Sequence, residues 1–399
     1  MMPAGPKGVA KARAARRRAA RSGDPLLLAV ATYNLGVALA AQGEVAEARA
    51  ALQQAAGSAQ PGIAPMAACN LGILLASQGQ PDEARAAYQQ AIDSGDARAA
   101  PLGWFNLAIL LAGQGDAGGA RAAFQHAIEG GDAQTAGEAA VNLGNLLAAQ
   151  GDSEAAQAAF GQAVSSGHPD VVASASFNLG NTLAEKGDLP GARAAYQRAM
   201  SSPHQDRASA AAFNLGNMLA RQGDPDGARA AYQRAIDSGH PDYAAKAAMN
   251  LGILLSGRGD ISGAQAAFRR VAESGHPDLA PRAAIELAGY LAEQGKIRAA
   301  TAALWRAAGS GHPEHAPGAA FYLGGLLAKN RNAAGARKAY QHAIDSGHAD
   351  YATKAAVNLG HLLAQKGDIQ RARATLQYAI DSGDADAAAK ARQILDQLS

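Results

Sequence analysis

The chain has 399 residues, of which 48% are hydrophobic but only 5% aromatic, and 46 are glycine. A deep single core is normally filled with bulky side chains, so this composition argues against one large domain and favours closely packed helices or stacked repeats. The formal charge of +2 gives the whole chain no general bias toward nucleic acid. The single cysteine, Cys69, excludes an internal disulfide and a metal site built from thiolates. The sequence has no apolar run long enough for a membrane span.

A strongly basic segment comes first in the chain. It has no acidic residue before Asp24 and seven cationic ones, which are Lys7, Lys11, Arg13, Arg16, Arg17, Arg18 and Arg21. At a spacing of 36, residues 1–25 align with the second half of the repeat that follows, so we expect a degenerate half-repeat that caps the stack with a solvated helix. The functional alternative is attraction to nucleic acid or an anionic membrane. The continuous repeat register disfavours a secretory signal.

Residues 26–385 form ten copies of one 36-residue unit without an insertion or deletion. The tripeptide Asn-Leu-Gly marks seven copies, and Asn106-Leu107-Ala108, Glu286-Leu287-Ala288 and Tyr322-Leu323-Gly324 stand in register at the other three. An Ala and, four residues later, a large apolar residue recur at the same period, as at Ala228 and Tyr232. Such a fixed period predicts a repeat architecture. Residues 386–399 read as one more helix of the first type, polar enough to close the stack.

Each unit is predicted to be a hairpin of two helices, with no strand signal anywhere in the chain. In one copy, Asp242 is expected to cap the first helix, which carries apolar residues at helical spacing. In the Gly223-Asp224 turn, the glycine is expected to close one helix in the left-handed conformation and the aspartate to cap the next. The loop Ser238-Gly239-His240-Pro241 then ends the second helix. Such a hairpin has one apolar face and needs neighbours to bury it.

This pattern resembles the tetratricopeptide repeat. The resemblance covers essentially the whole chain and rests on Asn214-Leu215-Gly216 in the first helix, Gly223-Asp224 in the turn, and Ala228, Tyr232 and Ala235 in the second helix. The chain departs from the family in its period of 36 rather than 34 and in its Ser-Gly-His-Pro-Asp loop, and its Ala and Gly richness is similar to the Sel1-like relatives. The resemblance implies an all-α, right-handed α-solenoid, a superhelix of helix-turn-helix repeats.

A row of asparagines is the main functional candidate. In the glycosyltransferase members of the family such a row lines the concave groove and grips peptide backbone, and a carboxamide can pair with an N–H and a C=O together. The alternative is that each Asn bonds a carbonyl of the neighbouring helix and only sets the stacking. The row breaks at Glu286 and Tyr322, so a continuous peptide track is expected from the first to the seventh Asn. Its members are Asn34, Asn70, Asn106, Asn142, Asn178, Asn214 and Asn250, with Asn358 beyond the break.

A second variable row follows three residues after each of these asparagines. It begins with apolar Val37, Ile73 and Ile109, continues with Asn145, Asn181 and Asn217, and returns to Ile253. This order suggests an apolar and then a polar stretch in the groove. Lys246 and Arg282 are candidates for binding a carboxylate of the partner. Ordinary variation among packed positions is the alternative for all of them.

A histidine series recurs in equivalent loops. We expect it to cap loops or form hydrogen bonds, with a pH-sensitive edge as a weaker alternative. A metal site is disfavoured because neighbouring histidines stand a repeat apart and no second ligand type accompanies them. Catalytic motifs are missing from the sequence, so no catalytic residue and no cofactor are predicted. The series is His168, His204, His240, His276, His312 and His348.

The sequence therefore predicts a non-catalytic scaffold that binds a protein or an extended peptide in its concave groove. Without the basic segment the 36 cationic residues fall to 29 against 34 acidic ones, which disfavours nucleic acid in the groove. One alternative is a structural or self-associating subunit, so a homo-oligomer is possible. Another is an enzyme or small-ligand receptor built in the groove. Composition and the single cysteine favour a cytoplasmic protein from a bacterium.

Overall fold

The computed structural model describes residues 6–398, and every regular element within that range is an α-helix. Residues 1–5 and Ser399, which belong to the two segments expected to cap the stack, lie outside the described residues. The chain divides into two compact units, Met1–Ala211 and Ala212–Ser399, and the boundary between them falls inside α12 (Gln205–Arg221).

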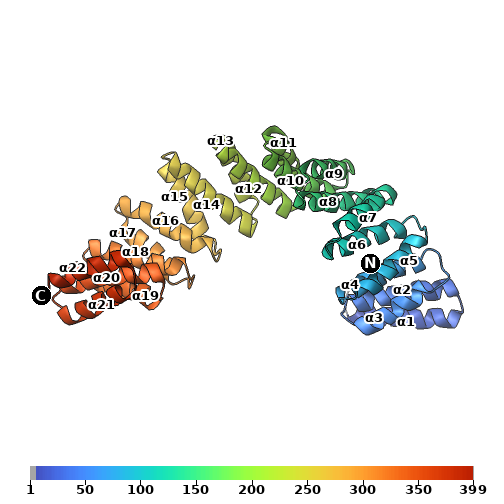
Figure 1. Cartoon of the computed structure of the whole chain (residues 1–399), viewed down its shortest axis with the longest axis horizontal. Helices are drawn as coiled ribbons and strands as arrows, with labels where there is room; N and C mark the ends of the chain where they lie inside the picture. Colours follow the sequence, from blue (N-terminus) through green and yellow to red (C-terminus); the bar gives the residue numbers. More distant parts are fainter. Residues whose placement is uncertain (1–5, 399) are drawn as a thin grey trace. The chain divides into compact units, whose positions relative to one another are not determined.

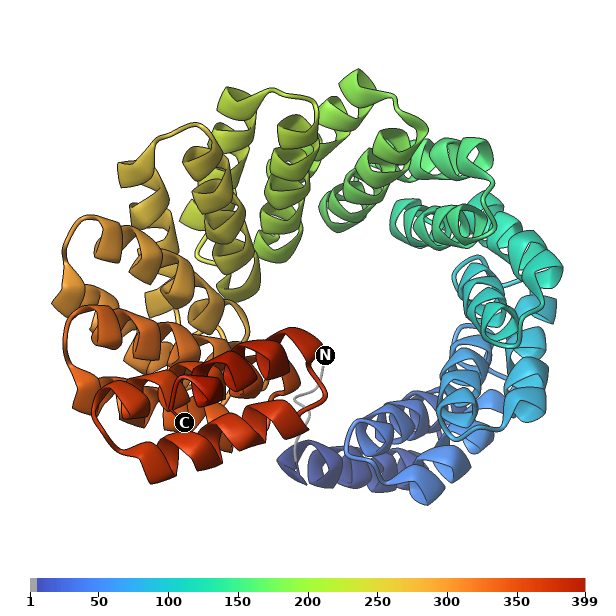
Figure 2. The same cartoon turned by 60° about the vertical axis from the view of Figure 1, so that its left-hand side comes forward.

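In the first unit, consecutive helices pack as antiparallel neighbours (Figure 1). The even-numbered helices, here called first helices, also contact each other directly from α2 to α10, and the odd-numbered second helices lie between them in the sequence. Figure 2 shows the same succession of helix pairs from another side. The helices are α1 (Pro6–Ser22), α2 (Pro25–Ala40), α3 (Val45–Ala56), α4 (Ala64–Ser77), α5 (Pro81–Asp93), α6 (Ala99–Gly113), α7 (Ala117–Gly130), α8 (Ala133–Ala149), α9 (Ser153–Ser165), α10 (Pro169–Lys186) and α11 (Leu189–Met200).

The second unit repeats this arrangement, with direct contacts between the successive first helices from α14 to α22. Both units are thus stacks of helical hairpins, which confirms the predicted all-α solenoid fold. The helices of this unit are α13 (Pro225–Asp237), α14 (Pro241–Gly257), α15 (Ile261–Glu273), α16 (Leu279–Glu293), α17 (Ile297–Ala308), α18 (His315–Lys329), α19 (Ala333–Asp345), α20 (Ala349–Gln365), α21 (Ile369–Asp381) and α22 (Ala385–Asp396).

The turn inside most hairpins follows the Gly-Asp signal of the sequence, whereas Glu44, Gln80 and Lys296 replace the aspartate in three others and make no side-chain cap. Gly223 has φ +75°, a left-handed value that only glycine adopts without strain. The next residue, Asp224, caps α13 by accepting a 2.9 Å hydrogen bond from the backbone N–H of Gly227. Local backbone chemistry therefore closes one helix and starts the next, as predicted.

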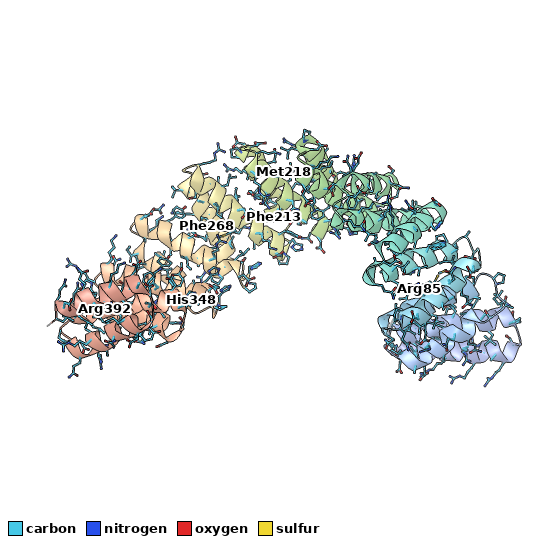
Figure 3. The ribbon with its side chains drawn as sticks, viewed as in Figure 1. Arg85, Phe213, Met218, Phe268, His348 and Arg392 are labelled. Atoms are coloured by element: carbon cyan, nitrogen blue, oxygen red, sulfur yellow. The ribbon has the colours of Figure 1, made fainter. Side chains whose placement is uncertain are left out.

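The core of most hairpins is a large side chain of the second helix packed against a glycine of the first, and Ala108 and Ala288 replace the glycine in the other two. Phe268 on α15, labelled in Figure 3, is 2% exposed, and a Cβ added at Gly252 would lie 2.7 Å from its ring. Tyr196 and Gly180 stand in the same relation in the first unit, also at 2.7 Å. The Gly of the Asn-Leu-Gly tripeptide is therefore required by close helix approach, and the core stays shallow.

One predicted helix start is wrong. Asp242 does not cap α14, because the helix begins one residue earlier at Pro241 and His240 is its N-cap. The ring Nδ1 of His240 accepts the backbone N–H groups of Asp242 and Tyr243, each at 3.2 Å. Proline is favoured at the first helical position because its missing N–H has no partner there, so the residue before it becomes the cap.

Charge is distributed unequally between the first helices. In the first unit, α2, α4 and α6 contain no Asp, Glu, Lys or Arg, whereas their second helices carry charges such as Arg85 on α5, labelled in Figure 3. These uncharged helices have 16, 14 and 15 residues. Among residues 6–398 no helix combines the length and the apolar character needed to cross a membrane.

Candidate functional site

The asparagine ladder, meaning the eight asparagines at this register, lies on the first helices, and each is followed by Leu and then by Gly or, after Asn106, by Ala108. The Leu after each Asn packs into the hairpin, and the Gly or Ala after that Leu lies against the second helix, so the Asn is left toward the surface. The seven members from Asn34 to Asn250 are half-buried, and Asn358 on α20 is exposed. The ladder is therefore accessible along α2, α4, α6, α8, α10, α12, α14 and α20.

In the first unit, three ladder amides are anchored on their own helix. The Nδ2 groups of Asn70, Asn106 and Asn142 donate to the carbonyl four residues earlier at 3.1, 2.8 and 2.9 Å. Asn70 also donates to the hydroxyl of Tyr33 at 2.8 Å. Within residues 6–398, the Oδ1 atoms of Asn106 and Asn142 accept no hydrogen bond. These two carboxamides are thus held in one orientation and keep an open acceptor and one N–H.

Further along, the ladder amides bond to the neighbouring repeat instead. Nδ2 of Asn178 donates to Oδ1 of Asn145, and Nδ2 of Asn250 donates to Oδ1 of Asn217, both at 2.8 Å. Oδ1 of Asn217 also accepts from the hydroxyl of Tyr232 at 2.8 Å. These bonds join adjacent first helices through side chains. The alternative considered from the sequence was that each Asn bonds a backbone carbonyl of the neighbouring helix. Asn178 and Asn250 instead bond a side-chain oxygen of that helix.

The difference between the two groups comes from the residue 33 positions earlier, which stands beside each ladder Asn on the preceding first helix. For Asn178 that residue is Asn145, which supplies an acceptor. For Asn106 and Asn142 it is Ile73 and Ile109, which supply none. Ile73 and Ile109 therefore offer no acceptor to the side-chain amides of Asn106 and Asn142, and these amides donate to a carbonyl of their own helix instead.

Those apolar residues form an exposed row on the first unit. Val37, Ile73 and Ile109, called the apolar row below, are 40%, 46% and 46% exposed on α2, α4 and α6, which contact each other. Asn145, on α8, is the exposed polar residue that follows them in register. The structure thus places an apolar strip beside the ladder on the uncharged helices. Ile253 on α14 is 49% exposed at the same register in the second unit.

The two predicted cations lie on neighbouring first helices of the second unit. Nζ of Lys246 on α14 bonds Oδ2 of Asp242 at 2.8 Å and stands 5.6 Å from the centroid of the Tyr243 ring. The hydrogen bond from Lys246 is the main cause that lowers the pKa of Asp242. Arg282 on α16 is exposed. Lys246 is therefore already paired within its own helix, and Arg282 forms no ion pair within residues 6–398.

Most members of the histidine series contact the preceding repeat, whereas the side chain of His168 makes no capping hydrogen bond. Nδ1 of His276 accepts the backbone N–H groups of Asp278 and Leu279 at 3.3 Å each, and Nε2 lies 3.2 Å from Oδ1 of Asp242 in the preceding repeat. Because Nδ1 is an acceptor, the proton of the neutral ring is on Nε2. The capping role matches the expectation from sequence. The carboxylate 34 residues earlier was missed, although its regular spacing was a readable signal. It recurs as His204 with Asp170, His312 with Asp278 and His348 with Glu314.

Two kinds of chemistry are not supported by these residues. Within 6–398, no group of three or more His, Cys, Asp or Glu side chains is placed to hold a metal ion. Cys69 is 3% exposed and donates through Sγ to the carbonyl of Ala99 at 3.3 Å. Burial raises the pKa of its thiol to about 12, so it stays protonated at neutral pH and is a poor nucleophile.

Comparison with protein families identifies tetratricopeptide repeats along the chain. One tetratricopeptide repeat model matches residues 69–136, 141–206 and 202–244, and another matches 29–54 and 354–377. A tetratricopeptide repeat-like domain matches residues 239–358. Together the matches run from residue 29 to residue 377 with short gaps. The search of curated proteins finds no significant match.

Solved structures of repeat proteins are similar at low identity. The protective antigen c5321 of uropathogenic Escherichia coli, which has an SLR fold, is 19% identical over 96% of this chain and 82% of its own, with a TM-score of 0.46. The C-terminal part of a TPR repeat-containing protein from Cytophaga hutchinsonii is 13% identical over 61% and 95%, with a TM-score of 0.48. YrrB, described as a TPR protein with an unusual peptide-binding site, is 22% identical over 52% and 97%, with a TM-score of 0.35.

Proposed function

This chain belongs to the tetratricopeptide repeat family, and from that premise we propose that it is a non-catalytic scaffold that binds an extended segment of a partner protein. The proposed contact surface is the first-helix face of the first unit. It consists of the ladder residues Asn70, Asn106 and Asn142 together with the apolar row.

The observation that carries the proposal is the state of the Asn106 and Asn142 carboxamides. One N–H of each is bonded to its own helix, so the amide is oriented before a partner arrives and loses little freedom on binding. The open Oδ1 can accept a peptide N–H and the second amide proton can donate to a peptide C=O. An extended chain presents both groups at every residue, so this contact needs no particular sequence.

The spacing of the helices supports an extended partner. Packed helices lie roughly 8–10 Å apart, and an extended chain rises about 3.3 Å per residue, so a strand crossing them would meet one ladder Asn about every third residue. The side chains of the partner would then rest on Val37, Ile73 and Ile109. Burial of apolar surface there would supply most of the affinity. The hydrogen bonds add less, because they replace hydrogen bonds to water.

The charge of the surface favours a protein over a nucleic acid. No Lys or Arg stands on α2, α4 or α6, so this face offers no cation to a phosphate backbone. The same helices offer no charged partner to acidic or basic side chains. We infer that the bound segment is uncharged and apolar opposite α2 to α6 and polar opposite Asn145.

The test is a selection of random linear peptides against the 399-residue chain, followed by dissociation constants for the recovered peptides. The double variant Asn106→Ala, Asn142→Ala should weaken binding about tenfold, since each lost hydrogen bond contributes about 0.5–1.5 kcal/mol. Asn358→Ala is the matched control, because it removes a ladder amide beyond the break at Glu286 and Tyr322, and it should leave affinity unchanged.

Circular dichroism and the mass in solution distinguish peptide binding from two other roles, which are a purely structural role of the amides and self-association of the chain. Helicity and thermal stability of the double variant should match the wild type if the amides serve binding. Loss of stability together with affinity, or failure to recover any peptide, would contradict the proposal. A mass that rises with concentration while no peptide binds would instead support the self-associating subunit.

A further inference from the structure

A groove of about 820 Å³ lies between the second helices α19 and α21, with the first helix α20 as its floor; Figure 1 labels the three helices. Leu359 and Leu363 of α20 line the floor and are 2% and 7% exposed. Arg337 and Lys338 of α19 line one wall, and Arg371 of α21 lines the other. Three cationic side chains therefore border one groove, and its lining contains no residue of the ladder or of the apolar row.

Two ion pairs in the first unit show what an arginine at the register of Arg337 reaches. Arg13 of α1 pairs with Glu47 of α3 at 2.7 Å, and Arg49 of α3 pairs with Glu83 of α5. In both pairs the glutamate stands 34 residues after the arginine. An arginine of one second helix thus reaches a carboxylate on the next second helix.

The same spacing leads from Arg337 to Arg371, so a cation stands where those two pairs have a carboxylate. Across the ten copies, the position of Arg371 holds Glu twice, Gly or Ala seven times, and a cation only here. Lys338 is equally unusual, because the other nine copies have Ala at its position. Like charges that line one groove repel each other, so an anion between them is favoured.

Little negative charge within the chain compensates these cations. Arg337 and Lys338 form no hydrogen bond or ion pair within residues 6–398. Nη1 of Arg371 lies 3.4 Å from Oδ2 of Asp368, the N-cap of its own helix, and the Arg371 side chain remains 70% exposed. An exposed pair at that distance contributes little. The groove therefore keeps its positive charge available to a ligand.

The groove also has a polarity along its length. Asp345 lines it as well and stands eight residues after Arg337 on α19, which is about 12 Å along the helix axis. Its Oδ1 accepts a hydrogen bond from Nε2 of Gln341 at 2.8 Å. An extended chain covers that length with about four residues. The ligand that matches is a short segment with its negative charge at one end, near the starts of α19 and α21.

We propose that this groove binds an acidic segment of a protein partner, with neighbouring carboxylates held by Arg337, Lys338 and Arg371. The two glutamate pairs of the first unit favour Asp or Glu side chains, because there the chain itself places a carboxylate at this position. A nucleic acid matches less well, since its phosphates would continue past the cations to Asp345. The site takes a charged segment, whereas the segment proposed for the ladder is uncharged.

Fluorescence anisotropy with the 399-residue chain tests the proposal. The probe is a labelled peptide, Gly-Ser-Glu-Glu-Leu-Ala-Gly-Ser, and the control peptide has Gln in place of both Glu residues. At low salt the acidic peptide should bind about tenfold more tightly than the control, because each exposed ion pair contributes up to about fivefold. Added salt should remove most of this difference.

Variants of the groove show whether the acidic peptide binds there or at the basic helix α1. The double variant Lys338→Ala, Arg371→Ala introduces residues that other copies hold at these positions, so it should fold normally and lose the tenfold difference. Arg371→Glu should also lose it, since the new carboxylate would pair with Arg337 as in the first unit. Arg298→Glu makes the same charge change at the start of α17, and this matched control should keep the difference.

Four outcomes would overturn the proposal. They are equal binding of the two peptides, acidic-peptide binding that both Arg371 variants leave intact, an equal loss in Arg298→Glu, and tighter binding of a short DNA duplex than of the acidic peptide. Thermal unfolding of each variant confirms that the fold is retained. The double variant Asn106→Ala, Asn142→Ala should keep the tenfold difference, so failure of this proposal is distinguishable from failure of the ladder.

Discussion

The first helices of the two units share one framework but differ in what they expose. In both units a Leu-Gly pair packs on a large side chain of the second helix, as at Gly180 with Tyr196 and Gly252 with Phe268. Toward solvent, α2, α4 and α6 show only uncharged side chains and the apolar row, whereas α14 and α20 carry the ion pairs of Lys246 with Asp242 and Lys354 with Asp350. The positions that hold the hairpin together are thus separate from those proposed to contact a partner.

The shared framework predicts the largest effect. Gly180→Val in the first unit and Gly252→Val in the second should each destabilise the affected hairpins by about 2–3 kcal/mol, because the added side chain overlaps a buried ring. Hydrogen exchange across the repeats measures the loss locally, since each repeat contacts mainly its neighbours. Gly113→Val, at an open helix end where an added Cβ meets nothing within 4 Å, is the control. Clearly unequal costs at Gly180 and Gly252 would show that the two frameworks are not equivalent.

The exposed apolar row predicts an effect confined to one unit. Ile73→Ser should weaken a peptide recovered against the chain about tenfold, because burying an Ile side chain contributes about 1.5–3 kcal/mol. Ile253→Ser, at the same register and similar exposure in the second unit, should leave the dissociation constant unchanged. Isothermal titration with both variants decides the point. Equal losses would mean that both units contact the peptide.

The smallest expected difference between the units is in how the residue that caps a first helix contributes to stability as the pH changes. In the first unit, Asp132 caps α8 by accepting the backbone N–H of Thr135 at 2.8 Å, and at the same register in the second unit His240 caps α14. The hydrogen bond from Thr135 is the main cause that lowers the pKa of Asp132. A carboxylate whose pKa is lower in the folded than in the unfolded state stabilises the fold at pH values above its unfolded pKa, which is about 3.9 for Asp. This contribution is lost as the pH falls through the folded pKa.

Asp132→Asn removes that titration while keeping an N-cap. The variant should be about 0.5 kcal/mol less stable than the wild type at neutral pH, since it lacks the negative charge at the helix N-terminus. The gap should close in acid, which thermal unfolding across pH measures. A gap that persists in strong acid would assign the effect to something other than the Asp132 charge.

Several features could be predicted because they depend on neighbours in the sequence. Gly223 and Asp224 close and open helices through their own backbone and side-chain geometry, and the structure agrees. The same local reasoning failed at Asp242, where the preceding proline moved the helix start by one residue and made His240 the cap. The carboxylate partner of His276 was also missed, because it belongs to another repeat.

By itself the sequence determined the helical hairpin and its 36-residue period, since the apolar spacing and the helix stops recur at the same register in all ten copies. Only the tertiary structure decided what each ladder amide does. Asn106 and Asn178 are the same residue at the same register, yet one turns to its own helix and the other bonds Asn145. The physical reason is that a side-chain hydrogen bond depends on the residue across the helix contact, and packing alone brings Ile73 or Asn145 there.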